Sequence, residues 1–462
     1  NAYVAPLMDR YLARVEAALG GRRLRIMQSN GGVITAATAR REAARTVLSG
    51  PAGGAVGAFH VAQMAGFDRI ISFDMGGTST DVALFPGRIV RTRESKIAGL
   101  PLRLPVVDIH TVGAGGGSIA RVDPGGALRV GPESAGADPG PACYGRGEEP
   151  TTSDANLLLG RLHADHFLGG EMPLYPERAR AALTRLASEM RVESAEKAAW
   201  GVIRVANATM ERAIRAISIE RGYDPRDFVL VPFGGAGPLH ACALAETLRI
   251  SRVLVPRTPG VLSALGMTVA DLVKDYSQTI MAGEEVLNPL TLDTIFAPLE
   301  ARAREDLLNE GIAAPDIVLE RALDMRYVGQ SHEITVTHPA DGDWGAAFHS
   351  AHEQRYGHRH EAEAIEVVNA RLRAVGRGPR PAFETLPEEG PDASQARLGT
   401  HPVWFSPDGP TPTALYDRDR LRAGNRFAGP AVVFQLDATT LIPPGWLARV
   451  DGWGNLLLTR RR

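Results

Sequence analysis

A short polar stretch between two apolar runs constrains the fold of this chain more than any other feature. It extends from Asp74 to Asp81 and contains, in order, Gly76, Gly77, Thr78, Ser79 and Thr80. The apolar residues before it, at 70–73, and after it, at 82–84, each fit a buried strand, and the paired glycines favour a tight turn. The sequence therefore predicts a β-hairpin whose tip is unusually polar.

The polar tip contains the groups that bind phosphate. Backbone amides of a glycine turn, together with the hydroxyls of residues 78–80, can converge on one oxyanion. Asp74 and Asp81 lie at the two ends of the turn, where a carboxylate holds Mg²⁺ through its waters or orients an attacking water. An ordinary hairpin with an Asx-type turn is the alternative. We favour phosphate binding, because the stretch has more polar groups than a turn needs.

Composition excludes several classes of protein. A chain of 462 residues with 44% hydrophobic residues can form roughly three domains with real cores. Its 51 basic and 53 acidic residues give a net charge of −2, so there is no electrostatic signature of nucleic-acid or membrane-surface binding. Only three lysines occur, at positions 96, 197 and 274, and none follows a glycine. This excludes a Walker A phosphate loop.

Cysteine content and hydropathy indicate where such a protein works. Cys143 and Cys242 are too few for a zinc site or a disulfide framework, and such sparse usage suits a reducing cytoplasm. The longest apolar stretch, 253–273, is broken by prolines and charged residues, so we expect no membrane span. The chain begins at Asn1 with no signal-like segment. We expect a cytoplasmic protein and a processed or truncated product.

Two further segments place glycines directly after or before predicted elements. Residues 48–54 open a helix that runs to about Met64. The N-terminus of this helix favours an anion, although a glycine turn that allows close helix packing explains these glycines equally well.

A strand at 104–112 leads into Gly113, Gly115 and Gly116. A dinucleotide fingerprint is rejected, because serine occupies position 118 and a returning strand comes next. We expect this turn to approach a ligand through its backbone.

A second strand–turn–helix unit occurs later in the chain. The buried strand 228–231 leads to Gly234, Gly235 and Gly237, and then to a helix through position 248. Pro238 suits the first turn of that helix. Glycines at these positions let a flat base or a ribose lie against the backbone.

Two sets of titratable residues invite a metal-site interpretation. Asp108 and His110 are two residues apart on one face of a predicted strand, as metal ligands or, as we favour, as a hydrogen-bonded core pair. Four histidines gather at positions 349, 352, 358 and 360, but without the metalloprotease spacing. We expect them to lie at a solvated helix end and to bind no structural metal.

The remaining pattern predicts the organisation of the chain. An opening helix has an apolar stripe, expected to pack on the next elements of the chain, at Tyr3, Leu7, Tyr11, Val15 and Leu19. An extended loop is expected at 131–144 and a capped helix beginning near Asn156. We predict a nucleotide-binding α/β domain at 1–278, an α+β domain at 279–375, a linker at 376–400 and a small β-rich domain at 401–462.

Four long motifs in order resemble a known family. They lie at 73–83, 108–118, 140–147 and 221–240, and a shorter one lies at 324–331. Together they resemble the A-subunit family of ATP-dependent hydantoinases and 5-oxoprolinases, which also supplies subunits to acetone and acetophenone carboxylases. The resemblance extends over almost the whole chain.

The resemblance implies a fold, cofactors and a reaction. It implies an actin, Hsp70 and sugar-kinase type of ATPase fold, with Asp74 to Asp81 as the phosphate loop and Gly234 to Gly237 as the adenosine-contacting turn. ATP and Mg²⁺ would be the cofactors, with Asp74 at the metal and both aspartates in catalysis. The reaction would be hydrolysis of a cyclic amide or imide after phosphorylation of its carbonyl oxygen, in a complex with a B-type subunit. A ketone carboxylase subunit and a non-catalytic nucleotide-gated scaffold are the alternatives.

Two departures from the family pattern qualify the resemblance. Family members usually have a second hairpin of this type upstream, whereas this chain has one. We therefore expect half of the ATP cleft to be missing and the chain alone to be inactive as a hydrolase. The loop at 144–153 is also shorter than the family form.

Overall fold

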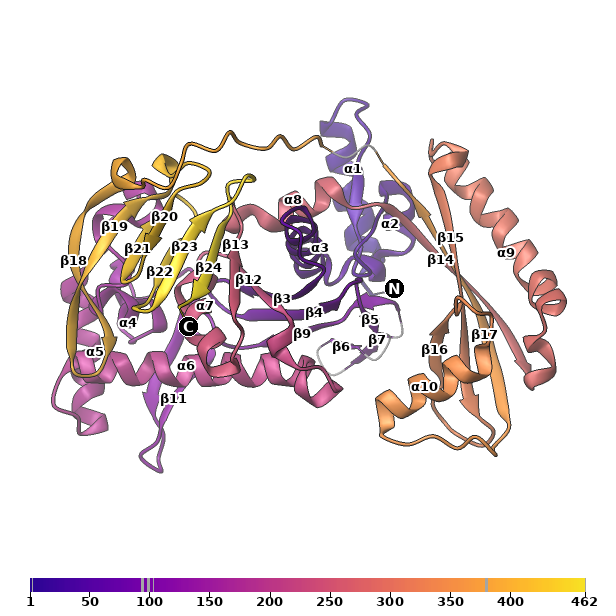
Figure 1. Cartoon of the computed structure of the whole chain (residues 1–462), viewed down its shortest axis with the longest axis horizontal. Helices are drawn as coiled ribbons and strands as arrows, with labels where there is room; N and C mark the ends of the chain where they lie inside the picture. The colour runs from indigo at the N-terminus through magenta and orange to yellow at the C-terminus, as the bar shows by residue number, and fades with distance from the viewer. Residues whose placement is uncertain (2, 93–94, 98–99, 103, 379–380, 462) are drawn as a thin grey trace. The chain divides into compact units, whose positions relative to one another are not determined.

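The computed structural model describes the whole chain except residues 2, 93–94, 98–99, 103, 379–380 and 462 (Figure 1). Contacts within the chain divide it into two compact units, each built from two distant segments. Unit 1 contains residues 1–49 and 269–381, and unit 2 contains residues 50–268 and 382–462. This division differs from the contiguous domains that the sequence pattern suggests, and those boundaries stay a prediction. Helices and sheets occur in both units, so the α/β class is confirmed.

Unit 1 is a six-stranded sheet with helices, in the strand order β1-β2-β14-β17-β15-β16. Its elements are α1 (Ala5–Ala18), β1 (Arg25–Met27), β2 (Val33–Thr35), α2 (Ala36–Arg41), β14 (Leu272–Ala282), α9 (Pro289–Asn309), β15 (Ile317–Tyr327), β16 (Ile334–Thr337), α10 (Trp344–Tyr356) and β17 (Ile365–Gly376). Helix α9 packs on β14, β15 and β17, and α10 packs on β16. Apolar side chains of alternate strand residues, such as Leu323 and Leu372, are buried in this unit.

The stripe predicted for the opening helix does not pack as expected. Tyr3, Leu7 and Tyr11 are 96%, 64% and 59% exposed, whereas Leu12 is buried with Ile34. The residues that face the core are Leu12 and its neighbour one turn earlier, Met8. A stripe drawn at a strict spacing of four drifts around a helix of 3.6 residues per turn, and here it drifts off the buried face.

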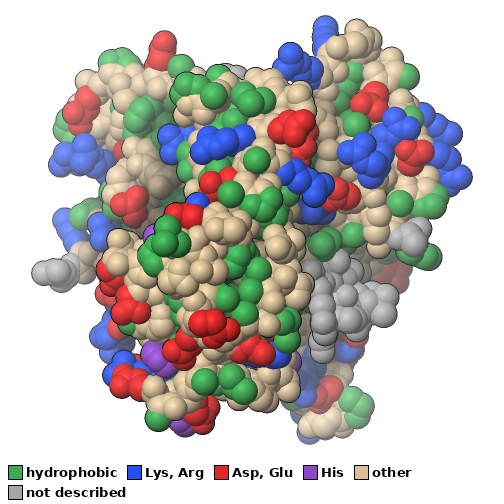
Figure 2. All heavy atoms as spheres, turned by 90° about the vertical axis from the view of Figure 1, so that its right-hand side faces the viewer, with side chains coloured by type: hydrophobic (Ala, Val, Ile, Leu, Met, Phe, Trp, Pro, Cys, Tyr) green, Lys and Arg blue, Asp and Glu red, His purple; other side chains and the backbone are tan. Residues whose placement is uncertain are grey.

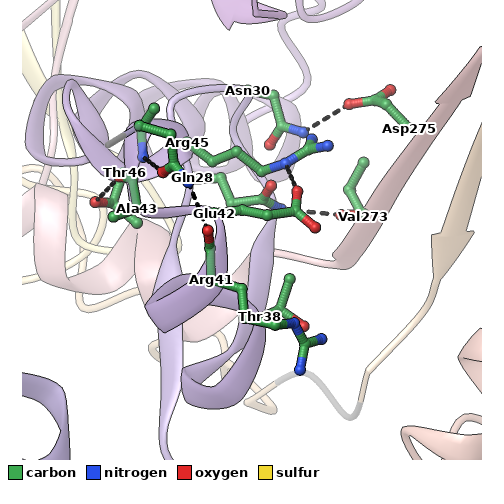
Figure 3. A network of polar contacts seen from close by, with 12 residues as sticks. Gln28, Asn30, Thr38, Arg41, Glu42, Ala43, Arg45, Thr46, Val273 and Asp275 are labelled. Atoms are coloured by element: carbon green, nitrogen blue, oxygen red, sulfur yellow. Dashed lines mark hydrogen bonds and ion pairs between the residues drawn. The ribbon is translucent and has the colours of Figure 1, made fainter. Parts of the chain in front are cut away.

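The turn between β1 and β2 is held by a buried polar network (Figure 3). The Gln28 amide donates to the carbonyl of Val273 at 2.9 Å, and the Asn30 amide donates to Asp275 at 2.9 Å. Gln28 and Asn30 are buried, so these bonds replace the water that their amides lose. They attach the turn to β14, which lies more than 200 residues later in the chain.

Unit 2 contains an eight-stranded mixed sheet in the order β20-β23-β24-β13-β12-β3-β4-β9 and a four-stranded sheet in the order β18-β19-β21-β22. Its helices are α3 (Ser49–Met64), α4 (Thr152–Leu158), α5 (Pro176–Met190), α6 (Ala195–Ile217), α7 (Gly237–Leu248) and α8 (Leu262–Val269). Its strands up to residue 255 are β3 (Arg69–Met75), β4 (Thr80–Pro86), β5 (Arg91–Thr92), β6 (Ser95–Ile97), β7 (Leu100–Leu102), β8 (Val106–Val107), β9 (Ile109–Val112), β10 (Ser118–Val122), β11 (Leu128–Ser134), β12 (Val229–Phe233) and β13 (Arg252–Val255). The later strands are β18 (Arg397–Ser406), β19 (Gly409–Asp417), β20 (Arg426–Ala428), β21 (Ala431–Phe434), β22 (Thr439–Ile442), β23 (Trp446–Val450) and β24 (Leu456–Arg460).

The two faces of the eight-stranded sheet are covered by different helices. Strands β3, β12 and β13 are parallel, and β4 pairs antiparallel with β3. Phe73 of β3 lies in the core formed with α6 and α7. The next residue, Asp74, points to the opposite face, because side chains alternate along a strand. On that face, Phe59 of α3 stacks on Phe85 of β4 with ring centroids 5.2 Å apart.

Two local predictions require correction. The loop expected at 131–144 begins with the last residues of β11, because the antiparallel strand that returns along β10 extends to Ser134. The helix expected to begin near Asn156 begins at Thr152. Thr151 and Asp154 form its capping box, in which each side chain bonds the backbone amide of the other residue.

The C-terminal residues belong to the same sheet as the hairpin. Residues 401–462 are rich in strands, as expected, and β20, β23 and β24 extend the eight-stranded sheet through the pairing of β24 with β13. Part of the expected linker at 376–400 is also structured, since Gly376 ends β17 and β18 begins at Arg397. Positions 379–380 of that segment lie outside the described residues.

The charge pattern seen in the sequence is also visible on the surface. Basic and acidic side chains are interspersed on the face drawn in Figure 2, with hydrophobic side chains between them. Such a mixed surface fits the net charge of −2. Among the described helices, none is long and apolar enough to cross a membrane.

Candidate functional site

The predicted hairpin forms, and its two aspartates are direct neighbours. Strands β3 and β4 pair in a register that places Asp74 opposite Asp81. The same row continues to Phe233 of β12 on one side and to Thr111 of β9 on the other. Four adjacent strands therefore present Phe233, Asp74, Asp81 and Thr111 side by side, on the face of the sheet that α3 covers.

Burial changes the proton affinity of both carboxyl groups. Burial, together with the neighbouring Asp81 carboxylate, raises the pKa of Asp74 to about 7. Burial also raises the pKa of Asp81, and a hydrogen bond donated by the Thr111 hydroxyl opposes that rise. Within the described part of the chain, no Lys or Arg side chain contributes to either shift. The pair is thus a partly buried concentration of acidic groups that no described Lys or Arg side chain stabilises in charged form.

This carboxylate pair fits a hard divalent cation. Mg²⁺ prefers oxygen ligands and is commonly held by one or two carboxylates, directly or through its waters. A cation between Asp74 and Asp81 would supply the missing counter-charge and would lower the pKa of both groups. The geometry thus agrees with the sequence-based assignment of Asp74 to a metal, and that assignment stays a prediction.

The tip of the hairpin is open to solvent. Gly76, Gly77 and Thr78 are exposed, and a Cβ atom added to either glycine would meet no atom within 4 Å. Gly76 donates its amide to Ser79 at 3.2 Å, whereas the amides of Gly77, Thr78 and Ser79 have no acceptor among the described residues. The glycines are therefore not required by the turn itself, and the open space beside them suits close approach by a ligand.

The prediction that the Thr80 hydroxyl faces a bound phosphate is wrong. Its side chain is buried, and its hydroxyl donates to the carbonyl of Ala114 at 2.5 Å. The alternation of side chains turns Thr80 towards the glycine loop 113–117. Its role is to fasten this loop to the hairpin.

The glycine loop approaches the hairpin, backbone to backbone. Gly116 and Gly117 donate their amides to the carbonyls of Gly76 and Gly77 at 3.0 and 2.6 Å. A Cβ atom on Gly115 would lie 2.6 Å from the amide nitrogen of Thr78, which leaves no room for any other residue. These glycines support the hairpin directly. Gly113 is a packing glycine, because a Cβ atom there would lie 2.6 Å from Pro132.

The turn 234–237 also lies against the hairpin, but beside β3, whereas the glycine loop follows β9 on the β4 side. Gly234 has a positive φ of 74°, and a Cβ atom on it would lie 2.4 Å from a carboxylate oxygen of Asp74. Ala236 donates its amide to the carbonyl of Met75 at 3.0 Å. Gly235 has space for a side chain, and Gly237 lies against the carbonyl of Phe73. The parallel pairing of β3 with β12 brings the two turns together at the carboxyl ends of both strands.

A small hollow lies beside the carboxylates. It is lined by Asp74, Asp81 and Phe233 and, from the first turns of α3, by Pro51 and Ala55. The amino end of a helix carries partial positive charge and favours nearby anions. The structure supports the packing explanation for the glycines at 48–54, because a Cβ atom on Gly54 would lie 2.6 Å from the Phe233 ring and one on Gly53 would lie 3.0 Å from the carbonyl of Ser263. Anion binding at this helix start stays a prediction.

The other titratable candidates lie elsewhere or have other partners. Asp108 forms an ion pair with Arg221, so it is not the hydrogen-bonded partner of His110 that we expected. The described residues include no group of three or more His, Cys, Asp or Glu side chains placed to hold a metal ion. Cys143 and Cys242 are buried, and burial raises the pKa of both thiols, which makes them poor nucleophiles at neutral pH.

The histidine cluster of unit 1 is only partly solvated. His358 and His360 are exposed, as expected, but His352 is buried on α10. One ring nitrogen of His352 contacts the carbonyl of His358 at 2.8 Å, and the other contacts Gln330 at 3.2 Å. His349 contacts the hydroxyl of Tyr327 at 2.7 Å. The expectation of a solvated helix end is therefore wrong for His352, whose ring is held by neighbours that the local sequence does not reveal.

Two residues at the site were missed by sequence reasoning. Thr111 reaches Asp81 through the pairing of β9 with β4, and Ser153 lies against the glycine loop, with its amide bonded to Gly116 at 2.7 Å. Thr111 lies in the motif at 108–118, and its alternation with His110 on a predicted strand was the available signal. Ser153 had no comparable signal, since it depends on how α4 packs.

Comparison with known proteins gives a consistent result. The family model described as hydantoinase/oxoprolinase matches residues 1–276, and the model of the hydantoinase/oxoprolinase C-terminal domain matches residues 282–460. An uncharacterised protein of Methanocaldococcus jannaschii is 40% identical over 100% of this chain and 69% of its own length. Caprolactamase subunit alpha of Pseudomonas jessenii is 36% identical over 98% of this chain and 67% of its own length. For 5-oxoprolinase 1 of Arabidopsis thaliana the identity is 34% over 99% of this chain, but over only 38% of the relative.

Two solved structures have the same fold. The ATP-dependent caprolactamase from Pseudomonas jessenii superimposes with a TM-score of 0.89 at 34% identity, over 100% of this chain and 69% of that chain. A nucleotide-free acetone carboxylase superimposes with a TM-score of 0.78 at 31% identity, over 98% of this chain and 67% of that chain. The mixed α/β fold is thus shared along the full length described.

Proposed function

Because this chain belongs to the hydantoinase/oxoprolinase family, we propose that it is the A-type subunit of an enzyme that uses ATP to hydrolyse a cyclic amide or imide. The observation that carries the proposal is the convergence of the hairpin 74–81, the glycine loop 113–117 and the turn 234–237 at one end of the eight-stranded sheet. On this proposal unit 2 has the actin, Hsp70 and sugar-kinase type of ATPase fold.

Each group at the convergence has a role in this proposal. The open amides of Gly77, Thr78 and Ser79 bind phosphate oxygens, and Gly76 gives them room. The turn containing Gly234, Gly235 and Gly237 lies beside the adenosine. The glycine loop, including Gly113, Gly115 and Gly116, supports the hairpin. Asp74 and Asp81 would hold Mg²⁺, which when bound would supply positive charge beside the phosphates.

The chemistry explains why ATP would be needed. An amide carbonyl is a poor electrophile, and an amide nitrogen is a poor leaving group. Transfer of a phosphoryl group to the carbonyl oxygen makes the carbon electrophilic, and water can then attack it. Phosphoryl transfer depends mainly on positioning and on charge stabilisation, which fixed amides and carboxylates provide.

A ketone carboxylase subunit is the second candidate, supported by the shared fold with acetone carboxylase. The two candidates are separated by the dependence of ADP release on co-substrates. We would measure ADP release by the chain together with a B-type subunit, with caprolactam, hydantoin or 5-oxoproline, and separately with acetone and bicarbonate. Stimulation by a cyclic amide without bicarbonate is expected. Stimulation only by a ketone with bicarbonate would favour the carboxylase, and no nucleotide binding at all would favour neither.

A further inference from the structure

A buried polar network lies beneath the three loops and is centred on the short helix α4. We propose that α4 is a shared support of the nucleotide site, in which Asp154 positions the phosphate hairpin and His240 positions the turn 234–237. This inference rests on the proposed function, because it assigns supporting residues to the same site.

Asp154 is a fully buried carboxylate that binds four donors. One oxygen accepts the amide of Cys143 at 2.7 Å. The other accepts the amide of Ala142 at 3.2 Å, the amide of Thr151 at 2.9 Å and the hydroxyl of Thr151 at 2.7 Å. The residue is 0% exposed and has no ion pair with a described Lys or Arg. Asp154 thus fixes the turn at 142–144 to the start of α4 by hydrogen bonds alone.

The start of α4 is in turn bonded to the glycine loop. Next to Asp154, Ser153 donates its amide to the carbonyl of Gly116 at 2.7 Å, and Gly116 donates its own amide to Gly76 at 3.0 Å. A connected path therefore runs from Asp154 along the backbone to Ser153 and then through two hydrogen bonds to the hairpin tip. Its free end is the set of amides at 77–79 that we assign to phosphate.

His240 makes the corresponding connection for the other turn. It lies one turn into α7, directly after residues 234–237, and it is 1% exposed. Nδ1 of the ring contacts the side-chain oxygen Oδ1 of Asn207 at 2.7 Å, and Nε2 contacts the side-chain nitrogen Nδ2 of Asn156 at 3.4 Å. Burial lowers the pKa of His240 to about 3, so the ring is neutral and donates through one nitrogen only. His240 thus joins α7 to α6 and to α4.

The two residues are predicted to fail in different ways. In an Asp154→Asn variant, an NH₂ group replaces one carboxylate oxygen and meets backbone amides that are also donors. The helix start then loses its fixed place against Gly116, and the hairpin tip loses its support. In a His240→Asn variant, the contact with Asn156 is lost, and the turn 234–237 then loses its fixed position.

The test compares Mg-ADP with adenosine as calorimetric probes of the full chain. Asp154→Asn should weaken Mg-ADP binding about tenfold or more and leave adenosine binding within about twofold, because only the phosphate half is disturbed. His240→Asn should weaken both ligands by the same factor. Asp123→Asn is the matched control, since Asp123 also accepts backbone amides but lies at the exposed far end of the β10–β11 hairpin. It should change neither affinity.

Folding is monitored separately by thermal melting. If Asp154→Asn does not fold, Gly116→Ala replaces it, because the added Cβ atom would lie 2.8 Å from the Ser153 hydroxyl and disturb the same link. Equal weakening of both ligands by the Asp154 or Gly116 variant, or no weakening, would overturn the inference while leaving the proposed function intact. Failure of the wild-type chain to bind either probe would overturn both.

Discussion

At the scale of single residues, the feature with the clearest consequences is the aspartate pair of the hairpin. Two carboxylates side by side on paired strands repel one another, and burial adds to the cost of charging both. Proteins retain such unfavourable pairs chiefly at functional sites. Asp74 therefore gives two predictions, one for activity and one for stability.

Asp74→Asn should lower Mg-ATP turnover in the assembled enzyme by about 10²–10³-fold, because the site loses a ligand for the metal. Folding stability in the absence of Mg²⁺ should not fall, since asparagine has nearly the same shape and removes the repulsion by Asp81. Steady-state ADP release and thermal melting measure the two quantities. Glu193→Gln, at an exposed surface ion pair, is the control and should change neither. Full turnover by Asp74→Asn would contradict the assignment.

The raised pKa of Asp74 predicts how stability depends on pH. Its pKa is about 7 in the folded chain and 3.8 as the reference value, so the folded state binds the proton more tightly. The stabilisation of the folded state by this group is therefore fully present below about pH 4. It decreases as the pH rises towards 7 and is lost above pH 7. The loss is on the order of 4 kcal/mol at most. In EDTA, Asp74→Asn should thus gain stability relative to wild type between pH 5 and pH 8, measured by urea unfolding. Parallel curves would contradict this pKa.

At the scale of elements, the glycines of the site separate into two kinds. Gly115 is pressed against the backbone of the hairpin, whereas Gly77 has open space around the position of a Cβ atom. Backbone atoms cannot move aside as a flexible side chain can, so only the first kind is required for folding. The two kinds therefore respond differently to the same substitution.

Gly115→Ala should destabilise the fold by about 1–3 kcal/mol, because its new methyl group overlaps the backbone of Gly77 and Thr78. Gly77→Ala should leave the melting temperature nearly unchanged but weaken Mg-ADP binding, because the methyl group occupies the approach of the phosphates. Melting curves and calorimetry give the two readouts. Gly452→Ala, in a turn with similar open space, is the control for both. If Gly77→Ala bound Mg-ADP normally, the hairpin tip would not be the phosphate site.

The elements also show what the sequence can predict and why. The hairpin, the glycine loop and the turn 234–237 are predictable from apolar runs and glycines, which are local signals. The pairing of β4 with β9 brings the glycine loop to the hairpin, whereas the turn 234–237 depends on the pairing of β3 with β12, whose residues are more than 150 positions apart. No local pattern encodes such a pairing. For the same reason the inward turn of Thr80 and the bond from Thr111 to Asp81 became visible only in the folded chain.

At the scale of the whole molecule, the segments that form the site all belong to unit 2. The hairpin, the glycine loop and the turn 234–237 lie within residues 50–268, and the C-terminal strands complete the same sheet. Unit 1 is likewise closed by β14 and β17 from the later segment of the chain. A division into contiguous domains cannot detect such an arrangement, because each unit is assembled from two separate segments.

The last prediction concerns the need for a partner subunit. In the described part of unit 2, no Lys or Arg side chain shifts the pKa of Asp74 or Asp81, so on the proposed function the carboxylate pair would rely on a bound metal ion and not on a basic side chain of this unit. A transferred phosphoryl group would thus lack part of its charge stabilisation, and one missing donor typically costs about 2.7–4 kcal/mol. Relatives of this chain are named as subunits of larger enzymes.

We therefore expect the chain alone to bind Mg-ADP but to release ADP from ATP slowly, at a rate that a cyclic amide does not change. Addition of a B-type subunit should raise the amide-dependent rate by at least about 10², the factor expected for one restored stabilising donor. Coupled-assay rates with and without the subunit, each with and without caprolactam or 5-oxoproline, measure this dependence. The Asp74→Asn chain with the same subunit is the control, and it should stay at the basal rate. Amide-dependent turnover by the chain alone, at the rate of the complex, would show that the hairpin site is sufficient by itself.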